Sequence, residues 1–82
     1  MILVDIYVPS VNTTYDFQLM DSVPVQTVIE EIAEMVGQKE QCQIVGDIAD
    51  LVLVDNKRQK VLDKEMTLYE CGIQTGDQLM LV

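Results

Sequence analysis

The sequence contains no histidine, the side chain that most often acts as a general acid or base in enzymes. Its two cysteines, Cys42 and Cys71, lie far apart and form no C-x-x-C pair. Two thiols without histidine cannot complete a structural zinc site or a plant-type iron–sulfur cluster. The four glycines, at positions 37, 46, 72 and 76, do not cluster into a nucleotide-binding loop. We therefore expect a protein that is not an enzyme and that holds no metal or other cofactor.

Positive charge is also scarce, with 5 lysines and arginines against 14 aspartates and glutamates and a net charge of −9. Binding to nucleic acid or to an anionic membrane surface requires clustered basic side chains. We therefore expect no nucleic-acid partner and no direct insertion into a membrane. The negative charge keeps a small domain soluble or, alternatively, steers a basic partner toward it.

Most of the few basic residues lie in one short segment, as Lys57, Arg58, Lys60 and Lys64. This cluster has two interpretations. It is a solvated hairpin whose charge discourages edge-to-edge pairing of strands, or it is a secondary basic patch that takes part in binding. The acidic residues Asp47, Asp50 and Asp55 lack the spacing of a helix–loop–helix calcium site, so they indicate a scattered acidic surface.

The sequence has no long apolar run. Its apolar start, MILV, is interrupted by Asp5, lacks a basic region and is too short for a signal peptide or a membrane span. We therefore expect a cytoplasmic protein. The 82 residues make one domain, residues 1–82, and the 49% of apolar residues are enough for a hydrophobic core.

The N-terminal segment shows the two-residue period of β-strands. The apolar positions of its first part, ILVDIYV, are Ile2, Val4, Ile6 and Val8. Those of its second part, TYDFQLM, are Tyr15, Phe17 and Leu19. Pro9 and the turn residues SVNTT close the first part and lead into the second, so we expect an N-terminal β-hairpin.

The segment VPVQTVIEEIAEMVG has the period of an amphipathic helix. Its apolar stripe consists of Val25, Val28, Ile29, Ile32 and Val36. Pro24 suits the first helical position, and Asp21 or Ser22 lies where a side chain can cap the helix start. Gly37 is expected to end the helix in a left-handed conformation. The remaining face carries glutamates and is expected to be solvated.

Residues 38–50 have no sustained period and predict an irregular connection. LVLVD then predicts a strand, NKRQ a turn and KVL a short return strand. Because both faces of LVLVD are apolar, its inward residues are either Leu51 and Leu53 or Val52 and Val54. A strand that is apolar on both sides is either sandwiched or leaves half of its surface for a partner.

The C-terminal segment opens with Thr67 and Glu70 in a T-x-x-E capping box, which starts a single helical turn that Gly72 stops. Leu68 and Ile73 are expected to anchor this turn to the core. QTGD then predicts a glycine-containing turn, and QLMLV predicts a final strand.

The segment TLYECGIQTGDQLMLV resembles the closing segment of ubiquitin and its relatives, with a threonine–leucine start, a one-turn helix, an isoleucine–glutamine pair, a turn and alternating leucines. Within it, CGIQTGDQL looks like the ubiquitin-like YukD/EsaB-type proteins found with WXG100 (type VII, ESX-like) secretion systems. The resemblance implies an α+β, β-grasp (ubiquitin-like) fold. This fold is a mixed four- to five-stranded sheet with one main helix on one face and a short one-turn helix near the C-terminus.

One departure from the wider ubiquitin-like pattern bears on function. Conjugated ubiquitin-like proteins and the sulfur carriers end in a diglycine that is activated as an adenylate, whereas this sequence ends in LMLV. We therefore expect neither isopeptide tagging nor thiocarboxylate delivery. The resemblance implies a non-catalytic protein-binding module. It would be a cytoplasmic accessory or regulatory component of a type VII secretion system, recruited by that complex to the inner face of the membrane.

The β-grasp order makes the first and last strands neighbours in the middle of the sheet. The face opposite the helix would then carry apolar residues expected to bind protein, namely Leu3, Tyr7, Val52, Val54, Met80 and Val82. An uncovered apolar cluster is costly in water unless a partner docks on it. The expected partner is a component of the secretion machinery or a second copy of the chain.

Two other functions stay open on the sequence alone. One is a small accessory subunit of a multicomponent oxygenase, because β-grasp subunits without cofactors occur in such enzymes. The other is the cytosolic ubiquitin-like domain of a larger membrane secretion protein.

Overall fold

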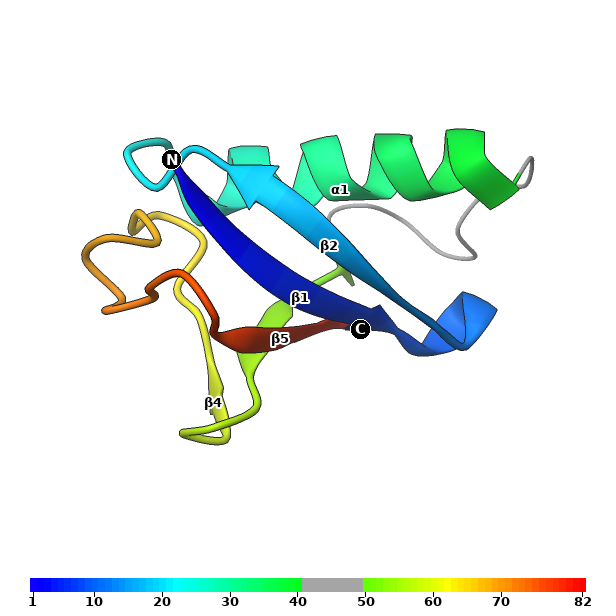
Figure 1. Ribbon diagram of the computed structural model, residues 1–82. Helices are drawn as coiled ribbons and strands as arrows, with labels where there is room; N and C mark the ends of the chain where they lie inside the picture. The colour runs from blue at the N-terminus through cyan, green and yellow to red at the C-terminus, as the bar shows by residue number, and fades with distance from the viewer. Residues whose placement is uncertain (41–49) are drawn as a thin grey trace.

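The computed structural model of the protein describes residues 1–40 and 50–82. It contains a five-stranded sheet with one helix lying across one face (Figure 1). The elements are β1 (Ile2–Val8), the 3-10 helix η1 (Pro9–Val11), β2 (Thr13–Leu19), α1 (Val25–Glu40), β3 (Leu53–Asp55), β4 (Lys60–Val61) and β5 (Gln78–Leu81). This is the predicted α+β, β-grasp arrangement. Most of the predicted irregular connection, with Cys42, Gly46 and Asp47, lies outside the described residues.

β1 and β2 form the predicted hairpin and pair antiparallel over all seven residues of each strand. The turn between them begins with Pro9, whose fixed φ suits the first position of a helical turn. It closes at Asn12, whose N–H donates to the Pro9 carbonyl over 3.1 Å. Asn12 has a φ of 50°, a left-handed conformation that asparagine adopts more readily than most residues.

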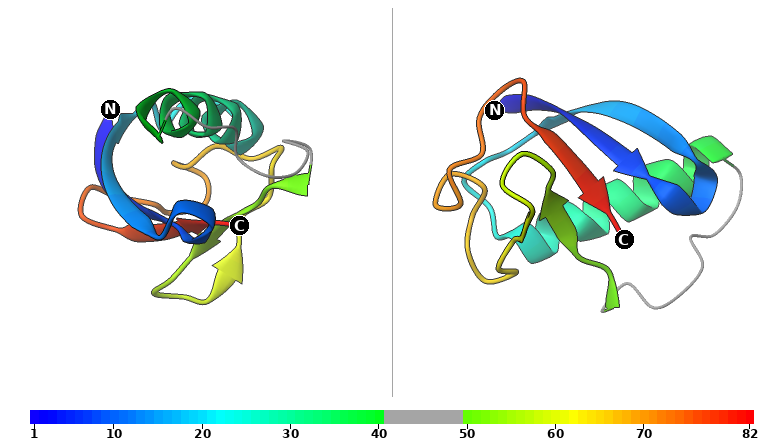
Figure 2. Two further views of the ribbon diagram at one scale, coloured as in Figure 1. Left: turned by 90° about the vertical axis from the view of Figure 1, so that its right-hand side faces the viewer. Right: turned by 90° about the horizontal axis from the view of Figure 1, so that it is seen from below.

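The strands lie in the order β2-β1-β5-β3-β4, so the first and last strands of the chain are neighbours, as predicted (Figure 2). β5 runs parallel to β1, with Leu79 opposite Ile6, and antiparallel to β3, with Leu79 opposite Asp55. The main chains of Val52 and Val82 exchange two hydrogen bonds of 2.8 and 3.0 Å. These bonds extend the β3–β5 ladder past the ends of both strands.

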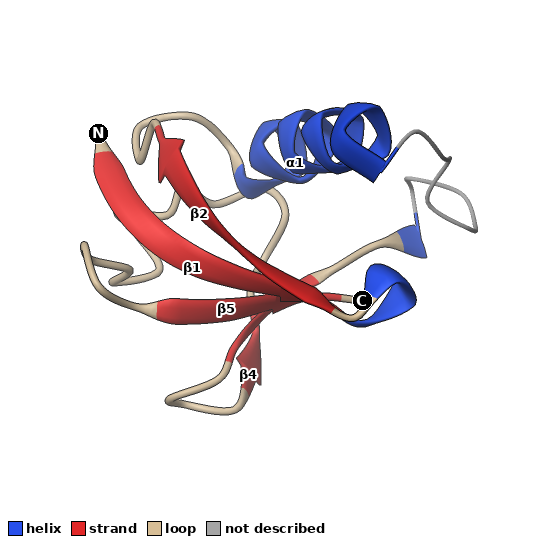
Figure 3. Ribbon diagram, turned by 45° about the vertical axis from the view of Figure 1, so that its right-hand side comes forward, coloured by secondary structure: helices blue, strands red, loops and turns tan. Residues whose placement is uncertain are grey.

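The core lies between α1 and the inner face of the sheet (Figure 3). The predicted helix stripe is confirmed, because its five members are all fully buried: Val25, Val28, Ile29, Ile32 and Val36. The inward residues of the sheet pack against this stripe and include Val4, Ile6, Val8, Phe17, Leu19, Leu79 and Leu81. Leu51 and Leu53 are buried as well, so Val52 and Val54 face outward. The longer leucine side chains fill the space beneath α1.

The start of α1 is held by a distant part of the chain. The N–H groups of Val25 and Gln26 donate to the main-chain carbonyls of Met66 and Lys64, over 2.8 and 3.0 Å. The first amides of a helix have no partner within the helix itself. Here they bind carbonyls of the segment before the 67–73 turn, where the sequence had suggested a side-chain cap close to Pro24.

The prediction that Gly37 ends the helix is wrong, because α1 continues to Glu40. A contact with β2 holds the extra turn, since Nζ of Lys39 lies 5.2 Å from the centre of the Tyr15 ring. A glycine inside a helix costs about 1 kcal/mol relative to alanine. A cation–π contact contributes about 0.5–1 kcal/mol, which is of the size of that cost.

At residues 67–73, where the sequence predicts a one-turn helix, the structure forms hydrogen-bonded turns without a helix. The capping box is present, since the Glu70 N–H donates to Thr67 Oγ1 over 3.0 Å and the Thr67 N–H donates to the Glu70 carboxylate over 3.1 Å. Gly72 ends the turn with a φ of 78°, and the N–H of Ile73 donates to the Leu68 carbonyl over 3.0 Å. Leu68 and Ile73 are buried, so they anchor the turn to the core as predicted.

Candidate protein-binding surface

The sheet register brings four apolar residues into one row on the face opposite α1. Tyr7 on β1 lies opposite Met80 on β5. Met80 in turn lies opposite Val54 on β3, and Val54 lies opposite Val61 on β4. Because successive residues of a strand alternate between faces and Leu79 is buried under α1, this row points away from the helix. The right-hand view of Figure 2 looks onto this face.

Val52 and Val82 extend the row into a patch. The two residues exchange main-chain hydrogen bonds and lie two positions along their strands from Val54 and Met80, on the same face. Val61 is 56% exposed and Val82 is 44% exposed. We call these six residues the outer-face patch: Tyr7, Val52, Val54, Val61, Met80 and Val82.

Leu3 faces the same side but lies apart from the outer-face patch. Asp5 stands between Leu3 and Tyr7 on this face of β1. The main chain of Leu3 is bound to the turn before β5, because its N–H donates to Thr75 Oγ1 over 3.3 Å and its carbonyl accepts from the Gly76 N–H over 2.9 Å. The structure therefore brings together five of the six residues that the sequence suggested, and it leaves Leu3 at the other end of β1.

Val61 is the member of the patch that sequence reasoning missed. The predicted return strand KVL contained it, and a tight turn at NKRQ would have paired this strand with LVLVD. Tyr7 lies at the β1 side of the patch, where its hydroxyl donates to Asn12 Oδ1 over 2.7 Å. This hydrogen bond fixes the orientation of the ring, so the patch has a defined aromatic border.

The basic cluster at residues 57–64 does not form one uniform surface. The Arg58 guanidinium lies 3.2 Å from the Asp55 carboxylate and donates to the carbonyls of Cys71 and Gly72, each over 3.4 Å. Asp55 is only 1% exposed and also accepts from the Lys57 N–H over 3.0 Å. Arg58 therefore connects the β3–β4 turn to the 67–73 turn, which is a structural role.

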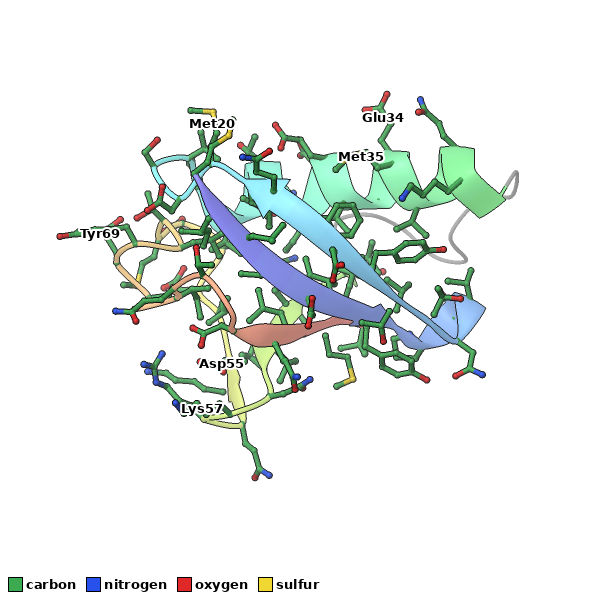
Figure 4. All side chains as sticks on the ribbon, in the orientation of Figure 1. Met20, Glu34, Met35, Asp55, Lys57 and Tyr69 are labelled. Atoms are coloured by element: carbon green, nitrogen blue, oxygen red, sulfur yellow. The ribbon has the colours of Figure 1, made fainter. Side chains whose placement is uncertain are left out.

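The other three cations of the cluster differ from one another. Lys57 and Lys60 are exposed, so their ammonium groups remain accessible to a partner (Figure 4 labels Lys57). Lys64 is half-buried, and its carbonyl accepts the Gln26 N–H of α1. The secondary basic patch suggested by the sequence is thus reduced to two lysines beside the β3–β4 turn.

Among the described residues, Cys71 carries a free thiol. Cys71 is half-buried, and this burial raises the pKa of its thiol, so little of the nucleophilic thiolate forms at neutral pH. Within residues 1–40 and 50–82, no group of three or more acidic or cysteine side chains is arranged to hold a metal ion. In the same residues, no helix is both long and apolar enough to cross a membrane.

These features define a ubiquitin-like protein of the β-grasp fold, with an apolar patch on the sheet face that α1 leaves uncovered. The chain belongs to the YukD family, described as the WXG100 protein secretion system (Wss) protein YukD, whose family model matches residues 3–81. The protein is therefore a ubiquitin-like module of that secretion system. A comparison with curated proteins found no match.

Two solved structures illustrate the fold. The solution structure of the N-terminal ubiquitin-like domain in the 4931431F19Rik protein superposes with a TM-score of 0.72 at 22% identity, over 99% of this chain and 72% of that one. The crystal structure of ATBAG1 in complex with HSP70 gives a TM-score of 0.75 at 15% identity, over 100% of this chain and 40% of that one. At these identities the likeness concerns the fold alone.

Proposed function

We propose that the protein is a non-catalytic binding component of the WXG100 (type VII) secretion system and that it binds another protein through the outer-face patch. The observation that carries this proposal is the row of Tyr7, Met80, Val54 and Val61, which crosses four strands on the side of the sheet that α1 leaves open. Membership of the YukD family supports the secretion assignment and disfavours the oxygenase-subunit alternative.

The energetics of the patch support a docking role. Apolar patches of a few hundred Å² on a small soluble protein commonly mark interaction sites. Covering ~300 Å² of apolar surface would contribute about 7 kcal/mol before the costs of association, which is enough for a modest affinity. The exposed Lys57 beside the patch adds a charge that can select among partners.

The proposed partner is a component of the machinery that exports WXG100 proteins. Such a partner would hold this protein at the cytoplasmic face of the membrane without any insertion of its own. ATBAG1, which contains a similar fold, was solved in complex with another protein, HSP70. Binding of a second copy through the same patch is the competing outcome.

The sharpest test replaces Met80 or Val82 with aspartate. A carboxylate at the centre of an apolar interface would have to be desolvated, so we expect Met80→Asp to reduce partner capture at least about tenfold while the monomer stays folded. Met20→Asp is the matched control, because Met20 is 48% exposed and lies at the end of β2, away from the patch (Figure 4).

Capture is measured by pull-down of the tagged full chain from its native host, with circular dichroism to verify folding. Unchanged capture by both patch variants would show that the proposed face is wrong. Size-exclusion chromatography with light scattering separates the competing outcome, since a dimer lost in Met80→Asp would make the partner a second copy. Deletion of the gene should reduce export of WXG100 proteins, and undisturbed export would remove the secretion role.

A further inference from the structure

The two edges of the sheet are built differently. Native proteins protect edge strands by keeping them short, by placing lysine or proline on them, or by interrupting them with bulges. β4 follows this rule, because it has two residues and carries Lys60. β2 does not: its seven residues, TTYDFQL, contain no proline, glycine or basic residue, and the register with β1 is continuous.

At every second residue of β2, the main-chain N–H and C=O groups point to this free edge. The Asp5 N–H donates to the Asp77 carbonyl over 3.1 Å, so the main chain of Asp5 points toward β5 and not toward β2. Asp5 and Asp16 therefore form a pair without mutual main-chain hydrogen bonds, in which the N–H and C=O of Asp16 point away from β1. Thr14 and Gln18 share this orientation by the two-residue period. Within the described residues, β2 has β1 as its single neighbouring strand.

The outer face of this edge carries an unfavourable pair of charges. Asp16 lies directly opposite Asp5, and like charges in this position of an antiparallel pair destabilise it. A hydrogen bond with Asp16, and the negative charge of that residue, raise the pKa of the Asp5 carboxyl above its usual value of 3.8. A cationic side chain placed next to Asp16 would relieve this repulsion.

The inner side of the edge is apolar and aromatic. Tyr15 and Phe17 lie on this side of β2, with ring centres 5.9 Å apart. Lys39 of α1 lies over the Tyr15 ring, and Met35, one helical turn earlier, is on the same flank of the helix and 37% exposed. Lys39 places a positive charge on the inner side of this edge, whereas Asp16 and Asp5 are on the opposite face of the sheet.

We propose that the free edge of β2 accepts an extended segment of another protein, in which a lysine or arginine faces Asp16 and apolar residues flank it. The main chain of such a segment would bind the exposed N–H and C=O groups of Thr14, Asp16 and Gln18. Its cation would continue the row of Asp5 and Asp16, and its apolar side chains would lie beside Tyr15 and Met35. This interaction goes beyond the proposed function, because the outer-face patch lies on β1, β5, β3 and β4, whereas this edge belongs to β2.

A second copy of the chain is a poorer occupant of this edge. Two β2 strands paired antiparallel about their centres would bring one Asp16 against the other, and each chain carries a net charge of −9. The charge complementarity therefore favours a basic segment from a different protein.

The experiment uses two probes with the isotope-labelled full chain. One is a short, acetylated and amidated peptide of alternating valine and lysine, and the other has glutamate in place of lysine. In heteronuclear NMR titrations we expect the lysine peptide to shift the amides of Thr14, Asp16 and Gln18 and to slow their hydrogen exchange. We expect the glutamate peptide to bind at least about tenfold more weakly.

Two substitutions with the same change of charge separate edge pairing from general attraction. Asp16→Lys should reverse the preference between the two peptides. Glu34→Lys is the matched control, because Glu34 lies on the side of α1 that faces away from the sheet (Figure 4) and should leave the preference unchanged. Asp16→Pro removes an N–H that points to the edge and no β1–β2 bond, so it should abolish binding in a folded chain.

Three results would overturn the proposal. The first is equal binding of both peptides, and the second is an equal effect of Asp16→Lys and Glu34→Lys. The third is a set of shifted amides centred away from residues 13–19. Analytical ultracentrifugation of the free chain adds a fourth, because a dimer abolished by Asp16→Lys or Asp16→Pro would make the occupant a second copy. The Met80→Asp pull-down tests the outer-face patch, and its outcome does not change the peptide results at β2. The two proposals can therefore fail independently.

Discussion

The two faces of the sheet belong to the same strands but are built differently. On the inner face Leu53 is fully buried, and the buried carboxylate of Asp55 is paired with Arg58. On the outer face Val54 is half exposed, although it is as apolar as its inward neighbours. Two polar residues of this face are also unfavourably placed, since the carboxylates of Asp5 and Asp16 lie opposite each other across β1 and β2.

The inner face is packed for stability, whereas the outer face keeps features that cost stability in the isolated chain. Exposed apolar side chains and opposed like charges are both unfavourable in water. Such local conflicts in an otherwise consistent structure are expected at functional sites. The contrast between the faces therefore supports the proposal that proteins bind to the outer face and to the edge of β2.

Truncating side chains on the two faces of the same strand should separate the faces most clearly. Leu53→Ala removes a fully buried side chain beneath α1, and we expect it to lower the free energy of unfolding by about 2–5 kcal/mol. Val54→Ala, one residue along and on the outer face, should cost about 1 kcal/mol or less. Urea denaturation monitored by circular dichroism measures both, and equal losses would contradict the distinction between the faces.

A smaller effect is expected from the buried carboxylate. Asp55→Ala removes the partner of Arg58 and of the Lys57 N–H, and we expect a loss of about 1–3 kcal/mol in the free energy of unfolding. Lys57→Ala is the control, because it keeps the main-chain donor and removes an exposed side chain, and it should change stability by about 0.5 kcal/mol at most. If the two variants unfold at the same urea concentration, Asp55 does not hold the two turns together.

The smallest effect concerns the opposed carboxylates of the outer face. Because the pKa of Asp5 is higher in the folded chain than its usual value of 3.8, the folded state binds this proton more tightly than the unfolded state. The stabilisation from this group is complete below pH 3.8 and is lost as the pH rises through the raised folded-state value.

Asp5→Asn should therefore be slightly more stable than the parent near neutral pH, and this advantage should shrink as the pH falls toward the acid range. The measurement compares urea midpoints of the two proteins at several pH values, with Glu34→Gln as a control for loss of one exposed negative charge. A constant difference across the whole pH range would contradict the raised pKa of Asp5.

Most of the fold could be predicted because its signals are local. The alternation of Ile2, Val4, Ile6 and Val8 predicts an inward face for β1, and the spacing of Val25, Val28, Ile29, Ile32 and Val36 predicts the buried stripe of α1. The capping box of Thr67 and Glu70 also depends on neighbours in sequence. The prediction failed at Gly37, where the contact of Lys39 with Tyr15 on β2 outweighs the preference of glycine for a helix end.

The candidate surface was predicted less completely, because it depends on which strands become neighbours. Leu3 has the outward phase of the patch but is separated from it by Asp5. Val61 joins the patch only because the short strand β4 pairs with Val54. Arg58 belongs to the basic cluster by sequence, yet its guanidinium binds Asp55 and the 67–73 turn.

Residue pattern and turn chemistry were thus sufficient for the type of the main strands and of α1 and for the inward faces of β1, β2 and α1, since hydrophobic period and capping act over a few residues. The β-grasp class was implied by the resemblance to ubiquitin-like proteins, and the inward face of β3 was decided by the packing of Leu51 and Leu53 in the core. Long-range packing determined the register across the strands, the amide partners at the start of α1 and the role of each exposed side chain. These features depend on contacts between residues far apart in the chain, and the free energy of such contacts is set only when the whole sheet closes over the helix.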